Sequence, residues 1–151
     1  MKVLLLGSGG REHAFAWKLA QSPTLNKLYI SPGNAGTSQC GENVDLDNKD
    51  FKALYDFCQL KQVDLLLPGN EDPLVAGITD YFEEQNLHHK HHILVAGPSK
   101  YAAQLEGSKD FSKQFMIRHK IPTARYQTFD KDSVEEGIFF LRTLDPPYLL
   151  M

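Results

Sequence analysis

The residues best placed to do chemistry stand at the start of the 151-residue chain. An apolar run, Val3–Leu6, precedes the glycine-rich turn Gly7-Ser8-Gly9-Gly10 and a helix-compatible stretch, Arg11–Gln21. Strand, glycine turn and helix in this order expose backbone N–H groups at a helix start, where partial positive charge can hold a phosphate. Arg11 can add a charged fork to this anion site. A tight turn without a ligand is the alternative, but three glycines in four residues exceed what a turn needs, so the pattern favours a ligand.

The spacing of these glycines argues against a dinucleotide site. The dinucleotide fingerprint has Gly or Ala three residues after its second glycine, and that position here is Glu12, whose carboxylate would crowd and repel a pyrophosphate. An acidic residue is also expected after the second strand, but the run Lys27–Ile30 is followed by Ser31-Pro32-Gly33-Asn34. The sequence therefore predicts a phosphate-bearing ligand other than NAD.

Two further loops follow strand-like runs and offer polar groups. In the loop Ser31–Thr37, the side chains of Asn34 and Thr37 can hydrogen-bond a ligand, although a plain surface loop explains them equally well. In the loop Pro68–Asp72, Glu71 can bind an amine or a ribose hydroxyl, or it can simply favour the dipole of the next helix. Ligands of open parallel sheets lie beyond the carboxyl ends of the strands, so three loops at one edge favour a shared site.

The elements that must position these loops alternate along the chain. Short apolar runs are separated by amphipathic segments, which predicts an α/β fold: an open parallel sheet with helices on both faces. The predicted strands are Val3–Leu6, Leu28–Ile30, Val63–Leu67 and Ile93–Ala96.

Helix starts can also be assigned from capping residues. Asp47 is expected to cap a helix that carries Phe51, Leu54, Tyr55 and Cys58. Asp72-Pro73 is expected to begin a helix with an apolar stripe of Leu74, Ile78 and Phe82. Farther along, Ser108 can cap a helix to about Lys120, and Asp132 with Glu135 resembles a capping box. Between these two helices, Thr123–Phe129 is typical of a strand.

A boundary is expected at Gly97-Pro98-Ser99, beyond which the pattern changes. We predict an N-terminal substrate-binding domain over residues 1–98, a linker over 99–107 and the start of a second domain over 108–151. The ending Pro146–Met151 is apolar and strand-like, and domains rarely stop on such a strand, so we expect the chain to be cut inside its second domain.

Composition narrows the function classes. Sixteen basic against nineteen acidic residues leave a net charge of −3 and no basic excess for nucleic acid. Cys40 and Cys58 lack metal or redox spacing and are expected to be reduced thiols. Val3–Leu6 is too short for a signal peptide or a membrane span. The tract His88–His92 could bind metal, but a solvated connection is the better expectation. We therefore predict a cytoplasmic protein of small-molecule substrates, without nucleic-acid or membrane partners, and leave its oligomeric state open.

Taken together, the loops resemble the N-terminal domain of the glycinamide ribonucleotide synthetase (phosphoribosylamine–glycine ligase) family of the ATP-grasp superfamily. The resemblance covers the whole chain through segments in matching order: Gly7–Ala14, Pro32–Thr37, Glu71–Ile78, Gly97–Ser99, Gln104–Lys109 and Ile121–Ala124. It implies a Rossmann-like pre-ATP-grasp domain followed by the beginning of an ATP-grasp domain. The implied enzyme of de novo purine biosynthesis joins glycine to 5-phosphoribosylamine through a glycyl phosphate, with ATP and Mg²⁺ (or Mn²⁺).

The resemblance also implies roles for particular residues. The phosphate of phosphoribosylamine would lie near the first loop, the second loop would line the same pocket, and Glu71 would lie near the ribose or the amine. Lys109 matches the first nucleotide-phosphate lysine of ATP-grasp enzymes. No catalytic or metal-binding residue is assigned. The implied substrate-binding residues are Gly9, Gly10, Arg11, Glu12, Asn34, Gly36, Thr37 and Glu71.

Two departures from the family pattern matter. Gly69-Asn70-Glu71 stands where the family has Gly-Pro-Glu, which loosens the loop and keeps the carboxylate. Met151 falls where a second ATP lysine is expected, so most of the ATP and metal site would lie outside the chain, and we expect these residues alone to have no ligase activity. Two alternatives stay open. One is the N-terminal domain of another ATP-grasp enzyme, such as a carboxylase, and the other is a Rossmann-like nucleotide-binding regulatory module, against which Glu12 argues.

Overall fold

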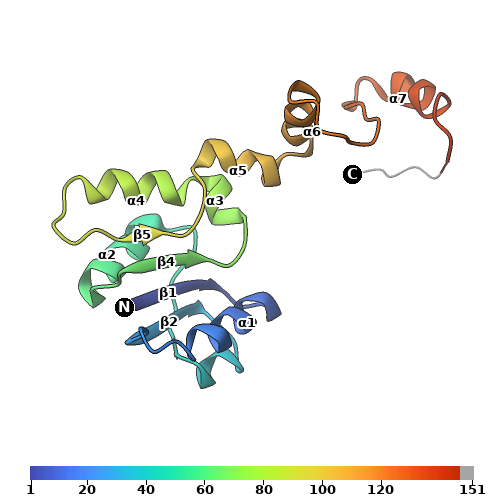
Figure 1. Ribbon diagram of the computed structural model, residues 1–151. Coiled ribbons are helices and arrows are strands. Elements are labelled where there is room, and N and C mark those ends of the chain that lie inside the picture. Colours follow the sequence, from blue (N-terminus) through green and yellow to red (C-terminus); the bar gives the residue numbers. More distant parts are fainter. Residues whose placement is uncertain (147–151) are drawn as a thin grey trace. The chain divides into compact units, whose positions relative to one another are not determined.

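The first part of the chain folds as a parallel sheet covered by helices. A computed structural model describes residues 1–146, which divide into two compact units, Met1–Gly107 and a second that begins at Ser108 (Figure 1). The sheet of the first unit has the strand order β3-β2-β1-β4-β5, with every pair parallel. Its strands are β1 (Lys2–Gly7), β2 (Lys27–Pro32), β3 (Glu42–Asn43), β4 (Leu65–Pro68) and β5 (Leu94–Val95). The predicted α/β class with an open parallel sheet is confirmed.

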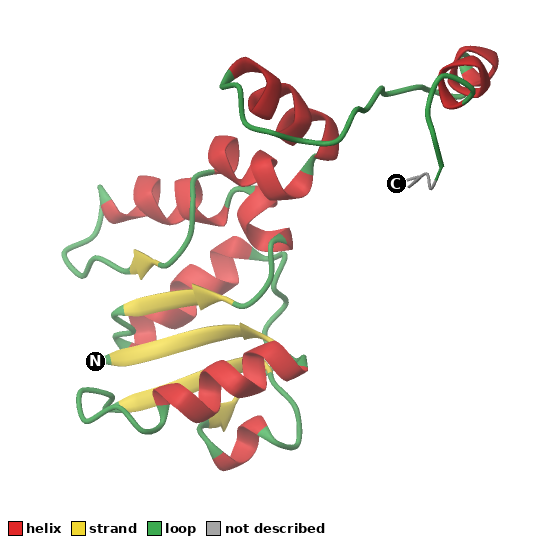
Figure 2. Ribbon diagram, turned by 45° about the vertical axis from the view of Figure 1, so that its right-hand side comes forward, coloured by secondary structure: helices red, strands yellow, loops and turns green. Residues whose placement is uncertain are grey.

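Helices cover both faces of the sheet because alternate residues of the central strand point to opposite sides. Leu4 and Leu6 of β1 join a core with residues of α2 and α4, whereas Val3 and Leu5 join a second core with Ala16 of α1. Figure 2 shows helices in front of the sheet and behind it. The first unit contains α1 (Gly10–Leu19), the 3₁₀ helix η1 (Thr37–Gln39), α2 (Phe51–Lys61), α3 (Asp72–Ala76), α4 (Ile78–Asn86) and α5 (Lys100–Gly107).

The strand order places a crevice beside the first loop. From β1 the chain builds β2 and β3 on one side, then crosses over to build β4 and β5 on the other side. Leu6 of β1 pairs with Pro68 of β4, so these two strands end next to each other with their following loops side by side. This reversal of direction is the switch point at which ligands of open α/β sheets bind.

One predicted strand is wrong and one observed strand was missed. Residues Thr123–Phe129 belong to no strand. The second unit, as described to residue 146, holds only helices α6 (Lys109–Arg118) and α7 (Val134–Leu141) and their connections. A strand needs a neighbour for its N–H and C=O groups. The missed strand, β3, has two residues and is too short for a pattern. The strand-like ending falls outside the described residues from position 147 on.

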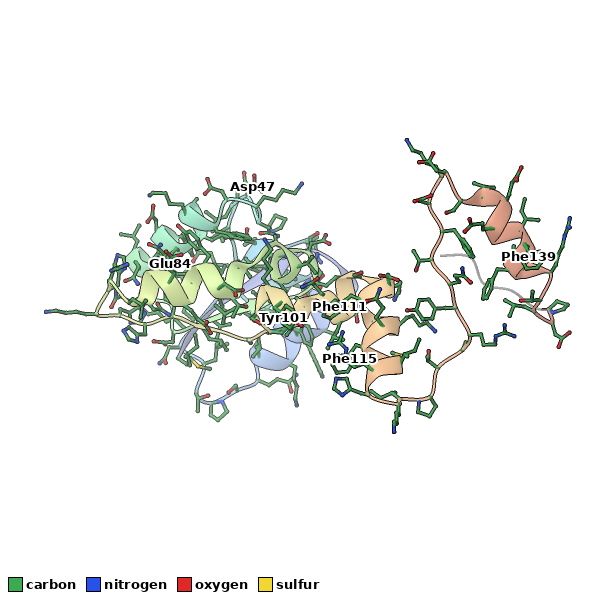
Figure 3. All side chains as sticks on the ribbon, turned by 90° about the horizontal axis from the view of Figure 1, so that it is seen from above. Asp47, Glu84, Tyr101, Phe111, Phe115 and Phe139 are labelled. Atoms are coloured by element: carbon green, nitrogen blue, oxygen red, sulfur yellow. The ribbon has the colours of Figure 1, made fainter. Side chains whose placement is uncertain are left out.

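The cap of α2 is Asp50 rather than the predicted Asp47. An Asp50 oxygen accepts a hydrogen bond from the backbone N–H of Ala53 at 2.9 Å. Asp47 lies in the preceding loop, where it accepts from the N–H of Lys49 at 2.9 Å (Figure 3). By sequence spacing alone, either aspartate could cap α2. The backbone turn between them places Asp50 at the N-cap position.

The helix predicted from Asp72-Pro73 is interrupted. Gly77 adopts a φ of 104°, which ends α3 and begins α4, and its left-handed backbone suits glycine. Asp72 lies inside α3 and does not cap it, because the preceding Glu71 is the N-cap residue. Ile78 and Phe82 of the predicted stripe are fully buried under the sheet, so the apolar pattern holds although the helix is broken.

Of the two caps in the second unit, one is confirmed and one is wrong. Ser108 Oγ accepts from the N–H of Phe111 at 3.2 Å and caps α6 as predicted. The N-cap of α7 is Ser133, not Asp132, because Ser133 is held in a turn in which the N–H of Asp130 donates to its hydroxyl at 2.8 Å.

Residues 99–107, expected to be a linker, cluster with the first unit, and all but the first of them form α5. Ala103 is buried, and a Cβ at Gly107 would lie 2.6 Å from Cγ2 of Val75, so α5 packs closely on α3. Among the described helices, none has the length and apolar character needed to cross a membrane.

Candidate functional site at the ends of β1 and β4

The first loop is shaped around the side chain of Glu12. Gly7 ends β1 with a φ of +134°, and a Cβ there would lie 2.3 Å from Cγ of Glu12. A Cβ at Gly9 would lie 2.8 Å from Oε2 of the same carboxylate. These glycines therefore admit the Glu12 side chain beneath the turn, in addition to any ligand that the loop receives.

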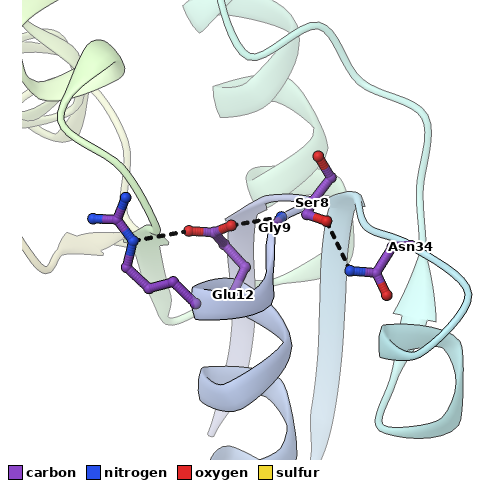
Figure 4. A network of polar contacts seen from close by, with 5 residues as sticks. Ser8, Gly9, Glu12 and Asn34 are labelled. Atoms are coloured by element: carbon purple, nitrogen blue, oxygen red, sulfur yellow. Dashed lines mark hydrogen bonds and ion pairs between the residues drawn. The ribbon is translucent and has the colours of Figure 1, made fainter.

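Glu12 caps its own helix. Its Oε2 accepts a hydrogen bond from the N–H of Gly9 at 2.7 Å, and the residue is only 5% exposed (Figure 4). A carboxylate at a helix N-terminus is stabilised by the amide dipoles there. One amide of the expected anion site is thus already bound to a negative charge within the protein. A pyrophosphate seated on this turn would meet that charge directly, as the sequence predicted.

The other oxygen of Glu12 faces the third loop. Oε1 is buried and has no hydrogen-bond partner among the described residues. Its nearest cation is Nε of Arg11, at an ion-pair distance of 3.6 Å. A Cβ at Gly69 would lie 2.6 Å from Oε1 and 2.6 Å from the backbone oxygen of Leu6. Glu12 is therefore enclosed between the loops that follow β1 and β4.

Asn34 fastens the second loop to the first. Its Nδ2 donates to the backbone oxygen of Ser8 at 2.7 Å (Figure 4). Its Oδ1 accepts from the N–H groups of Gly36 at 2.7 Å and Thr37 at 3.0 Å. These bonds occupy most of the amide's capacity, so Asn34 acts on any ligand mainly through the loop shape that it maintains.

Thr37 and Gly36 stabilise the same loop from inside. Thr37 is fully buried, and its hydroxyl accepts from the N–H of Asn34 at 2.8 Å and lies 2.8 Å from Oδ1 of Asn43. A Cβ at Gly36 would lie 2.3 Å from the ring of His13, so α1 packs directly on this loop. Sequence reasoning missed Asn43, because nothing in its neighbourhood marks it apart from an ordinary surface residue.

A groove of about 350 Å³ lies beside the first and third loops. Its charged lining consists of Arg11, Glu71 and Glu106, and its apolar lining includes Phe15 and Leu74. The structure thus brings Arg11 and Glu71 to one groove. Among the other predicted site residues, the first-loop residues Gly9, Gly10 and Glu12 do not line it. The second-loop residues Asn34, Gly36 and Thr37 do not line it either. Glu106, on α5, was not predicted, because its contribution depends on the packing of α5 against α3.

Lys109 lies in the second unit, where it is the exposed first residue of α6. The second unit has a hollow of its own of about 530 Å³, lined by Gln127, Glu135, Glu136, Phe139, Phe140 and Thr143. Phe139 points outward from α7 and is 71% exposed (Figure 3). None of the predicted site residues lines this hollow.

Cys58 and two histidines of the tract His88–His92 are engaged within the fold. Burial raises the pKa of the Cys58 thiol to about 12, so it stays protonated and unreactive. In the histidine tract, Nε2 of His91 lies 2.7 Å from the backbone oxygen of Val63, and Nδ1 of His89 lies 2.9 Å from that of Gln85. Across residues 1–146, no group of three or more His, Cys, Asp or Glu side chains could hold a metal ion.

Comparison with known proteins supplies a family. The family described as "Phosphoribosylglycinamide synthetase, N domain" matches residues 1–106. The chain is 48% identical to the phosphoribosylamine–glycine ligase of Haemophilus influenzae and 47% identical to that of Escherichia coli K12, over 99% of this chain and 34% of each relative. The chain therefore spans about a third of the length of the curated relatives that it matches.

Solved structures agree with this comparison. The phosphoribosylamine–glycine ligase of Thermotoga maritima superposes with a TM-score of 0.64 at 30% identity, over 97% of this chain and 32% of that one. The N5-carboxyaminoimidazole ribonucleotide synthetase of Thermus thermophilus gives a TM-score of 0.61 at 22% identity, over 91% of this chain and 36% of that one. The latter likeness establishes a shared fold only.

Proposed function

The chain belongs to the phosphoribosylglycinamide synthetase family, and we propose that it forms the phosphoribosylamine-binding part of a phosphoribosylamine–glycine ligase. Such an enzyme joins glycine to 5-phosphoribosylamine in de novo purine biosynthesis and releases glycinamide ribonucleotide. The family match over residues 1–106 carries the proposal, because it covers all three loops at the switch point of the sheet. We place this activity in the cytoplasm, on small-molecule substrates.

The proposed chemistry activates a carboxylate before an amine attacks it. ATP transfers its terminal phosphoryl group to the glycine carboxylate, which gives glycyl phosphate and ADP. The amine of phosphoribosylamine then attacks the glycyl carbonyl, and phosphate leaves. Within residues 1–146 the side chains do not fit a metal ion, so we assign Mg²⁺ (or Mn²⁺) and most of the ATP site to regions of a ligase beyond this chain. By itself the chain is expected to show no ligase activity.

Particular residues receive roles in this proposal. Arg11, exposed beside the groove, pairs with an anionic group of the substrate, and Glu71 binds a ribose hydroxyl or the amine. Gly9, Gly10 and Glu12 form the start of α1 beside Arg11, and we assign them to the binding of the substrate. Asn34, Gly36 and Thr37 keep the second loop in place beside Ser8. Lys109 contacts a nucleotide phosphate once the second domain is complete.

Calorimetric titration with glycinamide ribonucleotide, the stable product, tests the proposal directly. The chain should bind it, Arg11→Ala and Asn34→Ala should weaken binding, and NAD should give no heat. Glu84→Gln, on the exposed side of α4, is the matched control and should bind normally (Figure 3). Binding of NAD in place of the ribonucleotide, or silence towards the ribonucleotide by a folded chain, would refute the proposal.

A further inference from the structure

The unpaired Oε1 of Glu12 lowers the stability of the folded chain, and the fold alone does not explain why this oxygen is buried. Glu12 is 5% exposed, and its Oε1 has no hydrogen-bond partner in the part of the chain that the structure describes. A buried acceptor without a donor destabilises the folded state. The helix cap needs only Oε2, which already accepts from Gly9. The second oxygen of the carboxylate is not needed for the cap, so its burial without a donor points to a partner that arrives with a ligand.

Arg11 is the cation that lies beside this oxygen. Its Nε lies 3.6 Å from Oε1, which is an ion-pair contact beyond hydrogen-bond length. The Arg11 side chain is 61% exposed, whereas that of Glu12 is 7% exposed. Arg11 also lines the groove, together with Gly69, whose missing side chain leaves room for Oε1. The exposed Arg11 side chain can therefore turn into the groove at little cost, whereas the buried side chain of Glu12 cannot move in this way.

The charge of the groove sets which ligand can use this arrangement. Glu71 and Glu106 line the groove with a single guanidinium, and the buried carboxylate of Glu12 lies next to Gly69, which belongs to the lining. The N–H of Gly9 is occupied by Oε2. A plain anion on the glycine turn therefore meets one taken amide and a fixed negative charge. A ligand that also carries N–H or O–H donors meets a free acceptor instead.

We propose that Arg11 and Glu12 form a two-ended receptor. Arg11 turns away from Glu12 to pair with the anionic group of the ligand, and Oε1, released from the ion pair, accepts a hydrogen bond from an N–H or O–H group of the same molecule. The identity of that molecule rests on the proposed function, since a phosphorylated ribosylamine carries both kinds of group. The glycine turn then receives the donor-bearing end of the substrate, and its phosphate lies farther out, with Arg11.

The substitution Glu12→Gln separates this role from capping. Glutamine has nearly the same shape, its Oε1 can accept from Gly9, and its NH₂ group then presents donors where the carboxylate presented an acceptor. Two probes are titrated against ¹⁵N-labelled chain, with the amides of Gly9, Gly10 and Arg11 observed by NMR. Glycinamide ribonucleotide offers an anion and donors, and sulfate offers an anion alone. Arg11→Ala and the exposed control Glu84→Gln complete the set.

The two probes should respond in opposite directions. Glu12→Gln should weaken glycinamide ribonucleotide by about 10- to 100-fold, the value of a hydrogen bond to a charged group. The same variant should bind sulfate equally well or more tightly, because a negative charge is gone. Arg11→Ala should weaken both probes, and Glu84→Gln should change neither.

Three other outcomes of the titrations would contradict the proposed roles of Arg11 and Glu12. Equal weakening of both probes by Glu12→Gln would mean that the carboxylate only supports the fold, and tightening of both would mean simple charge repulsion. No change in either probe would mean that Oε1 meets no ligand. In all three cases the wild-type chain still binds the ribonucleotide, so the proposed function stands. Failure of the wild-type chain to bind it would overturn the proposed function and the receptor together.

Discussion

Gly69 should not tolerate a larger side chain without a loss of stability. A Cβ at this position would lie 2.3 Å from Cγ of Glu12 and 2.6 Å from the backbone oxygen of Leu6. Neither neighbour can yield freely, because Glu12 is enclosed by the first loop and Leu6 belongs to the central strand. Gly10 offers a matched control, since a Cβ there would meet nothing within 4 Å.

The magnitudes follow from these contacts. Overpacking a closed site costs about 1–3 kcal/mol. Displacing Glu12 also loses its charge-assisted bond to Gly9, a further loss of about 1.5–3 kcal/mol. Gly69→Ala should therefore lower the free energy of unfolding by about 3 kcal/mol or more. Gly10→Ala, in the first turn of α1, should raise it by up to about 1 kcal/mol, because alanine is the better helix former.

Urea unfolding followed by tryptophan fluorescence is the appropriate assay. Trp17 is the only tryptophan and lies in α1, so its emission reports the first unit alone. The double variant Gly69→Ala, Glu12→Ala should recover part of the loss, because one of the two clashes is removed and the contact with Leu6 remains. A stability of Gly69→Ala within 0.5 kcal/mol of wild type, the spread of ordinary surface substitutions, would refute the reasoning. An equal loss in Gly10→Ala would refute it as well.

Three further predictions follow from single contacts. Burial raises the pKa of Cys58 to about 12 from an ordinary 9.0, so the unfolded chain loses the thiol proton at a lower pH than the folded chain does. The free energy of unfolding should therefore fall between pH 9 and pH 12 by up to about 4 kcal/mol. A Cys58→Ala variant with the same pH dependence in urea titrations would contradict this. A thiol reagent at pH 8 should label the half-buried Cys40 and spare Cys58, as mass spectrometry would show, unless the first unit opens. Asn34→Asp should lose about 1–3 kcal/mol in the same fluorescence assay, since a carboxylate would face the backbone oxygen of Ser8 that now accepts from Nδ2, and unchanged stability would show that the second loop needs no such tie.

The central sheet could be predicted because its strands are buried on both faces. Residues 3–6 of β1 are fully buried, so they form a continuous apolar run that only a core strand or a buried helix explains, and the following glycines decide for the strand. The same logic holds for Leu28 and Ile30 in β2. Where burial is partial, the pattern fails: Thr123–Phe129 has strand-forming residues, but it is mostly exposed and finds no neighbouring strand within the described second unit.

Local rules predicted where helices begin only when one polar residue was available. Ser108 stands alone before α6 and caps it. Before α2, both Asp47 and Asp50 satisfy the rule, and the choice depends on a turn in which the N–H of Asp50 donates to the backbone oxygen of Asp47 at 3.0 Å. The break at Gly77 depends on the left-handed backbone of that glycine, and the apolar stripe does not reveal it because the stripe runs through the break unchanged.

The three loops could be located in advance, but the division of labour among their side chains could not. The alternation of elements predicts a parallel sheet, whose loops after the strands lie at one edge, and the observed strand order brings the ends of β1 and β4 together. Which side chains then face the groove depends on a few hydrogen bonds. The bonds of Asn34 turn it towards the loops, although its type and position suit a ligand contact equally well. Arg11 has no such bonds and remains at the groove.

A single position therefore separates two kinds of site on one scaffold. With Gly or Ala at the third position of the fingerprint, the amides of the turn stay free and a pyrophosphate can approach them. With Glu12, one amide is bound internally, the positive end of the helix is neutralised, and a buried acceptor replaces a donor. The fold, the strand order and the glycine at the end of β1 are compatible with both outcomes. The chemistry that the turn selects is thus set by the side chain beneath it, and glycines 7, 9 and 69 are needed to admit that side chain.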